Sequence, residues 1–418
     1  MQKELKENSK EKTMQKANKL IINPEWDEIF YKYENNNFSN HAFPLFLFTT
    51  RLYEQLAQEG CKDVLFMSRE GQFLKRLFDR YVEIRKEFNQ ETSDIKTHYF
   101  YGSRNSIMTA SAKPLEQEDF DMLLRFFKYF IKPRMFLFSI GFTNEQIDEV
   151  RQSFGKSMDK MCINFKTSKS FKKLLQNEDF KRIYEDNRLK QSHAFGQYMK
   201  SFDVDFNNNG LTFVDIGYHG TMQDLIFKFF DEKVKMHGYF IKSRAKQHQD
   251  NAKTGLLGDN NNKELFGSKI NKYDTFNYEQ ILRADHGRCL GYQVQDDNSA
   301  IPMIDTEHRD VEVFEKYIKT MQSQIFEKFE LIARKSMTND VDMAKICTIY
   351  FYYTVKNKTK ADYQWILDMQ DSHHDDFGYV GYPGKAFARW LRKFAFKLKD
   401  KIFIFNNKSY IKKLKKNM

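Results

Sequence analysis

Cysteine is scarce in this chain, and its spacing forms no recognisable pattern. The 418 residues contain four cysteines, Cys61, Cys162, Cys289 and Cys347, with no Cys-x-x-Cys pair among them. Such spacing indicates neither a zinc site nor a disulfide framework. Isolated cysteines are typically buried free thiols. We therefore expect a protein of the reducing cytoplasm, without structural disulfides.

Long apolar runs are missing too. No stretch approaches the roughly 18–20 apolar residues that a membrane-spanning helix needs. The first 18 residues are polar and charged, which is unlike the apolar core of a secretory signal peptide. We expect residues 1–20 to form a polar N-terminal arm and the protein to have no transmembrane segment.

Most of the chain carries no excess of charge. The net charge is +11, and residues 385–418 account for all of it with twelve Lys or Arg and one acidic residue. Aromatic and aliphatic residues are interleaved with these bases, a composition typical of a helix lying on an anionic membrane surface. A helix docked on the body and a nucleic-acid patch are the alternatives. The neutral body has no basic stripe and no nucleic-acid reader motif, which argues against nucleic acid.

Hydrophobic periodicity predicts alternating strands and helices, the pattern of a largely parallel α/β sheet. We predict a catalytic α/β domain over residues 21–300, with a helical insertion at about 115–205. A helical region over 301–370 and a basic amphipathic tail over 385–418 follow. The predicted strands are 64–67, 97–101, one starting at 211, and 238–241; the predicted helices are 44–58, 72–88, 222–230, 310–335 and 341–356; and 247–263 is predicted to be a polar loop.

Two predicted strands run into short loops with the composition of a phosphate site. The first loop contains Ser68, Arg69, Glu70 and Gly71. Ser68 is a good helix N-cap, Arg69 can hold phosphate with two hydrogen bonds, and Gly71 permits close approach of a ligand. Ligands of open α/β sheets bind at the carboxyl ends of strands, where helix N-termini expose N–H groups. Two such loops indicate a ligand with two anionic ends.

The second loop follows the strand that begins at Leu211. It contains Asp215, Gly217, Gly220 and Thr221. The glycines allow a tight turn close to a ligand, and Thr221 is the expected N-cap of the next helix, with Asp224 three residues on. A carboxylate repels phosphate, so Asp215 is better suited to hydroxyls or to a cation such as Mg²⁺. A turn with glycines needed only for packing is the alternative.

Two further segments complete the set of candidate residues. Ser103 and Arg104 follow the strand 97–101 and repeat the pairing of a hydroxyl with an arginine. Residues 278–288 mix acids and bases, and Asp285 and His286 within them are candidates for a general base acting on a sugar hydroxyl. An ordinary polar loop is the alternative for this second segment.

Taken together, these segments resemble a known family. The series is Phe-Pro (43–44), Leu-Phe-Met-Ser-Arg-Glu-Gly-Gln-Phe-Leu (65–74), Tyr-Gly-Ser-Arg (101–104), Asp-Ile-Gly-Tyr-His-Gly-Thr-Met-Gln (215–223) and Ala-Asp-His-Gly (284–287). It resembles a region encoded in bacterial polysaccharide gene clusters, whose usual wording is S-R-D-G, S-R-R and D-I-G-W-x-G-T or -S. In this chain Glu70 replaces the Asp of S-R-D-G, and Tyr218-His219 replaces the Trp-containing pair.

The resemblance covers residues 43–292 and implies a phosphoribosyltransferase-like fold and activity. Proteins of this kind use phosphoribosyl pyrophosphate (PRPP) and Mg²⁺ to add ribofuranose to surface glycans of capsule or O-antigen type. The implied acceptor is a lipid-linked or oligosaccharide sugar. The phosphatase of haloacid-dehalogenase type that often accompanies the region is absent here, so a separate phosphatase would act in trans.

The resemblance also implies roles for individual residues. The implied PRPP ligands are Ser68, Arg69, Gly71, Ser103, Arg104, Asp215, Gly217, Tyr218, His219, Gly220 and Thr221; the implied catalytic residues are Asp215, Glu70, His219, Asp285 and His286; and Asp215 and Glu70 are the implied metal ligands. A cytoplasmic enzyme at the inner face of the membrane is expected. A glycosyltransferase using a nucleotide sugar and a non-catalytic scaffold of glycan assembly are the alternatives.

Overall fold

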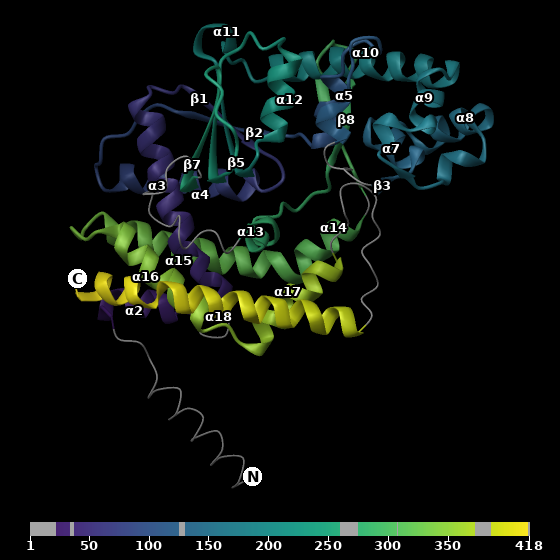
Figure 1. Ribbon diagram of the computed structural model, residues 1–418. Helices are drawn as coiled ribbons and strands as arrows, with labels where there is room; N and C mark the ends of the chain where they lie inside the picture. The colour runs from purple at the N-terminus through teal and green to yellow at the C-terminus, as the bar shows by residue number, and fades with distance from the viewer. Residues whose placement is uncertain are drawn as a thin grey trace.

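The computed structural model describes residues 22–33, 37–124, 130–259, 275–306, 308–372 and 386–416. The predicted N-terminal arm, 1–20, lies outside these residues. The architecture is α/β: a parallel five-stranded sheet has helices on both faces, and a layer of C-terminal helices lies below it (Figure 1). The predicted fold class, a largely parallel sheet with a helical insertion and a helical C-terminal region, is confirmed.

The sheet has the strand order β2-β1-β5-β6-β7, with every neighbouring pair parallel. Its strands are β1 (Asp63–Met67), β2 (Lys96–Phe100), β5 (Leu211–Tyr218), β6 (Met236–Ser243) and β7 (Asn251–Asp259). From β1 the chain crosses to β2 on one side, and it later returns to β5 on the other side of β1. The gap between β1 and β5 is therefore the point where the strand order reverses, and ligands of open α/β sheets bind at such a point.

Helices cover both faces of the sheet because its strands are apolar on both sides. Along β1, Val64 and Phe66 pack in one hydrophobic core, and Leu65 and Met67 pack in the other. Alternate residues of a strand point to opposite faces, and burial on both sides turns the usual alternation into a continuous apolar run. This is why the short run at 64–67 reads as a strand even without polar residues between its apolar ones.

The first core joins the sheet to helices from both ends of the chain. These helices are α2 (Pro24–Tyr31), α3 (Ala42–Gln58), α4 (Gly71–Glu87), α13 (Thr275–Ile281), α15 (Lys319–Ser336) and α16 (Met343–Lys356). Ile325 and Phe329 of α15 are fully buried in the same core as Val64. The C-terminal helices therefore complete the core of the α/β domain, and the predicted boundary at 300 falls at the start of strand β9.

The second core contains the helical insertion. Its helices are α5 (Arg104–Ala110), α6 (Asp121–Leu124), α7 (Pro133–Ser139), α8 (Asn144–Phe154), α9 (Lys169–Leu175), α10 (Glu178–Lys200) and α12 (Thr221–Phe229). Two small antiparallel strand pairs accompany them, β3 (Phe130–Ile131) with β4 (Cys162–Ile163) and the hairpin of β8 (Cys289–Val294) with β9 (Ala300–Ile304). Helix α8 starts with a capping box in which Thr143 and Gln146 exchange hydrogen bonds.

The prediction of a polar loop at 247–263 is wrong over most of that range. Residues 251–259 form β7, the edge strand beside β6, while 260–263 lie outside the described residues. Two of the polar side chains that suggested a loop, Asn251 and Lys253, are buried and paired. Gln223 of α12 donates to Asn251 Oδ1 over 2.6 Å, and Lys253 forms an ion pair with Asp224. Contacts with α12 thus satisfy polar groups that periodicity alone assigns to solvent.

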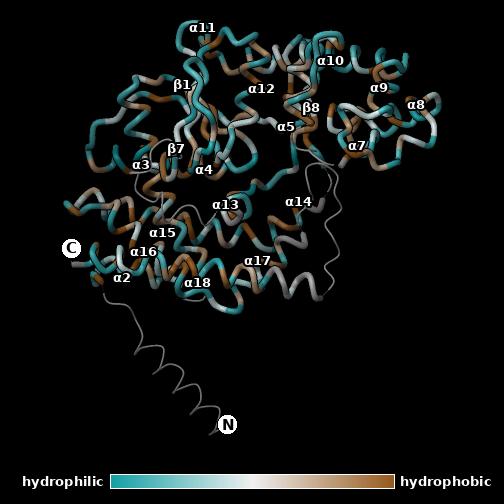
Figure 2. The backbone as a smooth tube through the Cα atoms, in the orientation of Figure 1, coloured by the Kyte–Doolittle hydropathy of each residue, from teal (hydrophilic) through white to brown (hydrophobic). Residues whose placement is uncertain are grey.

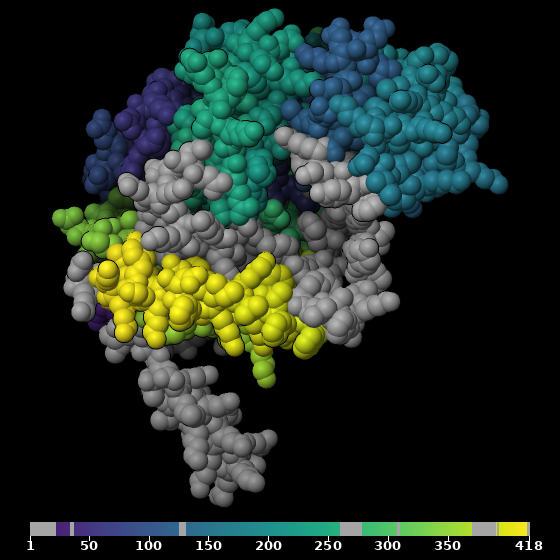
Figure 3. Space-filling model, viewed as in Figure 1, coloured from purple at the N-terminus to yellow at the C-terminus, as the bar shows by residue number. Residues whose placement is uncertain are grey.

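The tail forms one helix, α18 (Ala386–Lys416), which lies across the front of the molecule below the sheet (Figures 1 and 3). Phe403 and Ile411 are buried in a small core with Ile349, Phe351 and Val355 of α16. The C-terminal layer also contains α14 (His308–Val313), which precedes α15, and α17 (Lys360–Ser372), which lies between α16 and α18 in the chain. Within the described residues, no helix combines the length and hydrophobicity that a membrane crossing requires.

Candidate functional site

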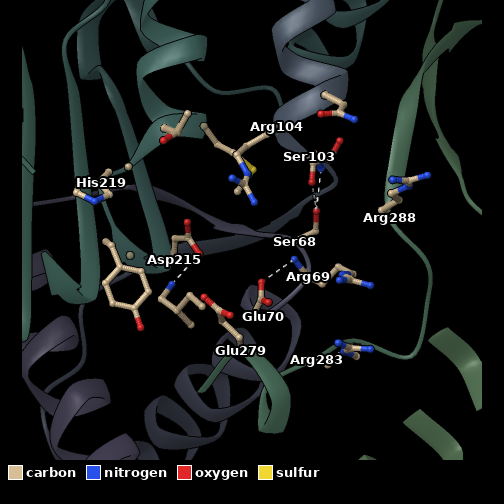
Figure 4. A pocket seen from close by; sticks show the side chains of 18 residues that line it. Ser68, Arg69, Glu70, Ser103, Arg104, Asp215, His219, Glu279, Arg283 and Arg288 are labelled. Carbon is tan, nitrogen blue, oxygen red and sulfur yellow. Dashed lines mark hydrogen bonds between the residues drawn. The ribbon is translucent and has the colours of Figure 1, made fainter. Parts of the chain in front are cut away.

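A polar cavity of about 300 Å³ lies at the carboxyl ends of β1, β2 and β5. It sits at the gap where the strand order reverses, and its volume is at the lower limit of known ligand pockets. Three segments at strand ends form most of its wall: the β1 loop (68–71), the β2 loop (102–105) and residues 215–221, which comprise the end of β5 and the turn into α12 and are called the β5 loop here. Side chains from these loops point into one space in Figure 4. Segments more than 100 residues apart in sequence thus share one pocket.

Most of the residues predicted from the sequence line this pocket. The lining includes Ser68, Arg69, Glu70, Ser103, Arg104, Asp215, Gly217, Tyr218, His219, Gly220 and Thr221. Gly71, Asp285 and His286 are not among the lining residues. Parallel strands end at the same edge of a sheet, so residues placed at or just after the ends of β1, β2 and β5 are brought together by topology alone.

The β1 loop is tied to the rest of the protein by its side chains. Ser68 Oγ donates to the Gly102 carbonyl over 2.7 Å and accepts from the Gly102 N–H over 2.8 Å. Ser68 is therefore not the N-cap of α4, as predicted; Glu70 occupies that position without a side-chain cap. The hydroxyl instead joins the β1 and β2 loops, because the two strand ends lie side by side.

Gly71 also has a different role from the predicted one. A Cβ at this position would lie 2.7 Å from the carbonyl carbon of Phe66. The close approach that requires glycine is between α4 and β1, not between the loop and a ligand. Gly71 is thus needed for helix–strand packing beneath the pocket.

Arg69 is fixed by a contact from the C-terminal layer. Its Nη1 lies 2.8 Å from Asp310 Oδ2, and the other Asp310 oxygen lies 3.1 Å from Nη1 of Arg283. Asp310 belongs to α14, about 240 residues further along the chain. One carboxylate therefore holds two of the pocket's guanidinium groups, a charge-assisted arrangement that restricts their orientation.

The β5 loop is shaped mainly by its backbone. Gly217 has φ of 112° and Gly220 has φ of 64°, both in the region that favours glycine. A Cβ on Gly217 would lie 1.9 Å from the Lys242 carbonyl of β6. Gly217 is therefore required by the neighbouring strand, which agrees with the packing alternative for the glycines, while the loop itself still forms the pocket wall.

The start of α12 also differs from the prediction. Gly220, not Thr221, is the N-cap, and no side chain caps the helix. Asp224 does not complete a capping box; its carboxylate accepts from Asn251 Nδ2 over 2.8 Å and pairs with Lys253. The first N–H groups of the nine-residue helix are thus not capped by a side chain, and Thr221 and Met222 line the pocket. Such an end favours a bound anion.

Asp215 is buried at the base of the pocket, with its Oδ1 accepting from the Ile216 N–H over 2.7 Å. Burial raises the pKa of this carboxyl to about 8, and the negative charges of Glu70 and Glu279 add to the rise, whereas Arg104 opposes it. Figure 4 shows Asp215, Glu70 and Glu279 on the same side of the pocket. A group of carboxyls that repel one another in this way is relieved by binding a cation.

These carboxyls suit Mg²⁺ bound together with a phosphorylated substrate. Among the described residues, no three His, Cys, Asp or Glu side chains are grouped as a ready-made metal site. Mg²⁺ is usually held by one or two carboxylates, with waters and substrate phosphates completing the shell. Asp215 and Glu70 provide that many, so the donor set fits the ion predicted from the sequence.

Sequence reasoning missed three charged residues of the lining, Glu279, Arg283 and Arg288. The segment containing them was recognised, but Asp285 and His286 were chosen from it. Arg283 is 1% exposed although it lies in the apolar stretch Ile281-Leu282-Arg283-Ala284. An arginine inside a buried apolar run was the available signal, because such a charge is rarely buried without a partner.

Asp285 and His286 lie behind the β1 loop. Asp285 accepts from Gln72 Nε2 over 2.9 Å, and His286 Nε2 lies 2.7 Å from the Tyr99 hydroxyl. The same hydroxyl reaches the Arg69 carbonyl at 3.4 Å. Burial lowers the pKa of His286. Through these contacts the two residues support the β1 loop, and they do not line the pocket.

The pocket is richer in guanidinium than in carboxylate. Arg69, Arg104, Arg283 and Arg288 line it, against Glu70, Glu279 and Asp215. Two further carboxylates outside the lining pair with three of these arginines: Asp310 with Arg69 and Arg283, and Asp305 with Arg288. This arrangement suits a ligand with several negative charges and a bound cation.

No protein-family model matches the chain, and no curated protein matches it either.

Proposed function

We propose that this protein transfers the 5-phosphoribosyl group of PRPP to a sugar hydroxyl of a surface glycan and releases pyrophosphate. One observation carries the proposal: the three motifs of the resemblance, after β1, β2 and β5, converge on a single arginine-lined pocket. PRPP has anionic groups at both ends of its ribose. The pocket has an uncapped helix N-terminus on one side and arginines on the other, which matches that distribution of charge.

In the proposed complex, the 5-phosphate lies at the N-terminus of α12, against the N–H groups of Thr221 and Met222. Arg69 and Arg104 hold the pyrophosphate, and Arg283 and Arg288 add positive charge around it. Mg²⁺ held by Asp215 and Glu70 would neutralise charge on the pyrophosphate. Positioning and preorganised charge of this kind supply most of the rate in such transfers.

The reaction exchanges one bond at the ribose C1 carbon. The bond from C1 to pyrophosphate oxygen breaks, and pyrophosphate leaves with the electron pair. The acceptor oxygen forms the new bond to C1, and its proton passes to a base. His219 brings an imidazole to the pocket wall, and we assign it the role of that base.

The product would retain its 5-phosphate. We propose that a separate phosphatase removes it in trans, and that the acceptor is a lipid-linked or oligosaccharide sugar. The enzyme would then work at the cytoplasmic face of the membrane. The proposal involves no nucleic acid.

The test is incubation of the pure protein with PRPP, Mg²⁺ and candidate glycan acceptors, with pyrophosphate release as the readout. We expect release that depends on both acceptor and Mg²⁺. Calorimetry with PRPP and, separately, with nucleoside diphosphates distinguishes the alternatives. Binding of nucleoside diphosphates but not PRPP would favour a nucleotide-sugar glycosyltransferase, and binding of neither would favour a scaffold.

A further inference from the structure

Helix α18 has two faces that carry large apolar side chains, and within the described residues its inward face packs against the rest of the protein. The inward face consists of Phe396, Asp400, Phe403, Asn407 and Ile411, spaced three or four residues apart. The ring centroids of Phe403 and Phe351 are 6.4 Å apart. Asp400 Oδ1 lies 3.7 Å from Lys358 Nζ. The sequence left two interpretations of this helix open, one docked on the body and one lying on a membrane, and each interpretation applies to a different face of the helix.

The outward face carries a second stripe of large apolar side chains. Trp390, Phe394, Leu398, Ile402 and Phe405 are 59%, 56%, 46%, 51% and 81% exposed. Residues three and four apart share a helix face, so these five form one continuous stripe. Exposed large apolar residues in such a row mark an interaction surface. Figure 3 shows α18 spread across the surface, and Figure 2 shows hydrophobic and hydrophilic residues interspersed along it.

Lysines border the stripe on both sides. Lys397, Lys401, Lys408 and Lys412 follow one edge at spacings of four and seven residues, and Lys399 and Lys413 lie along the other; all six are exposed. Asp400, the one acidic residue of 385–418, belongs to the inward face. The described part of the outward face is thus apolar in the middle and positive at its edges.

We propose that α18 binds the surface of an anionic lipid bilayer through this outward stripe while its inward face stays packed on α16. Lysines at the edges complement anionic headgroups, and exposed Trp and Phe side chains are the residues that enter the headgroup boundary. The helix has 31 residues, a length of about 46 Å, which suits an extended flat surface. The proposal does not depend on the reaction at the pocket.

The spacing of the stripe argues against a second helix as the occupant. Consecutive stripe residues are four, four, four and three apart, so the stripe drifts around the helix. A coiled-coil seam needs spacings that alternate between three and four. A broad drifting stripe fits a fluid surface better than a narrow helix–helix seam.

The test uses the full chain and vesicles of two compositions. One set contains equal parts phosphatidylglycerol and phosphatidylcholine, and the other contains phosphatidylcholine alone. We expect sedimentation with the anionic vesicles at low salt and release at high salt, because surface attraction is screened over about 10 Å at 0.1 M salt. No sedimentation with anionic vesicles at low salt would overturn the proposal.

Variants then locate the binding surface. Phe394→Ala with Phe405→Ala should weaken binding by at least about tenfold, since each large side chain loses burial. Lys401→Glu with Lys408→Glu should weaken it about fivefold or more for each lysine replaced. Leu189→Ala removes an equally exposed apolar side chain, 56% exposed, from α10, and should leave binding unchanged. Equal loss in all three variants would contradict the assignment.

Trp390 provides a direct readout of insertion. It is 59% exposed whereas Trp26 is 1% exposed, so vesicle binding should shift Trp390 emission to the blue and make it sensitive to brominated lipid. Trp390→Phe should lose most of this signal and keep binding. A different outcome would assign the stripe to a second copy of the chain. In that case the protein would self-associate without lipid, the Phe394→Ala, Phe405→Ala variant would not, and vesicles would leave the Trp390 emission unchanged.

Discussion

The β1 and β5 loops look alike in sequence, yet the protein holds them in different ways. Both follow a buried strand, contain small and polar residues and run into a helix. In the β1 loop, side chains do the fixing: Ser68 bonds to Gly102, and Arg69 pairs with Asp310. In the β5 loop, the backbone does it, through Gly217 and Gly220 at positive φ.

The difference indicates how each half of the pocket tolerates change. A loop held by side chains can lose one contact and keep its path, because the other contacts remain. A loop held by backbone geometry has no substitute for the residue that permits the geometry. We therefore expect the β5 loop to be the more sensitive of the two, and the following four substitutions test that difference in order of expected effect.

The largest effect is expected for Gly217→Ala. Positive φ costs roughly 1–2 kcal/mol for an L-residue, and the clash with the Lys242 carbonyl adds about 1–3 kcal/mol. The unfolding free energy from urea titration should fall by their combined amount, and the proposed transferase activity should be lost. Gly155→Ala is the matched control, because Gly155 has φ of 84° and nothing within 4 Å of its added Cβ. Equal losses in the two variants would show that the contact with β6 does not matter.

Asp215→Asn should reduce turnover by about a hundredfold or more, as loss of a preorganised charged group does, and should also stabilise the protein. The pKa of Asp215 is raised from 3.8 to about 8, so the folded state disfavours ionisation that the unfolded state allows. The cost is absent below about pH 4, grows as the pH rises and levels off above about pH 8. We expect the variant to gain about 2–4 kcal/mol at pH 7 and almost nothing at pH 4.

Urea titrations at several pH values check the stability of Asp215→Asn, and pyrophosphate release checks its turnover. Asp148→Asn, at an exposed side chain, is the control for the pH dependence. A gain that does not change with pH would mean that Asp215 ionises normally in the folded protein.

A smaller effect is expected for Arg69→Lys in the β1 loop. The charge is kept, but an ammonium cannot hold two oxygens in one plane. Losing one such charge-assisted contact should weaken PRPP binding about tenfold, measured calorimetrically with Mg²⁺, while stability changes little. Arg182→Lys, on the exposed surface of α10, is the control. Unchanged affinity in Arg69→Lys would remove Arg69 from the proposed PRPP site.

The smallest effect is expected for His286→Asn, behind the β1 loop. Its contact with Tyr99 supports the loop from outside the pocket, so turnover should stay within about threefold of the original, a change below 1 kcal/mol in the barrier. Pyrophosphate release is again the measurement. A loss comparable to that of Asp215→Asn would return His286 to the catalytic role that the sequence suggested.

The sequence predicted those helices and strands in which the apolar residues follow a single periodicity along the whole element. The helices α3, α4 and α16 and the strands β1, β2, β5 and β6 were predicted within a few residues of their bounds. Strand β7 was missed because Asn251 and Lys253 look solvent-exposed, although partners on α12 bury them. The pocket loops were found because small and polar residues follow apolar strands, a signal present in the chain itself.

The amino-acid sequence by itself determined the parallel α/β class, the three strand ends that line the pocket and the concentration of positive charge in the tail. Each depends on neighbours along the chain: periodicity, an abrupt change of polarity or a run of lysines. Only the tertiary structure decided that Ser68 joins two loops, that Asp310 holds Arg69 and Arg283, and that α18 has a docked and an exposed face. These features depend on atoms brought together from residues tens to hundreds of positions apart, and no local pattern specifies such partners.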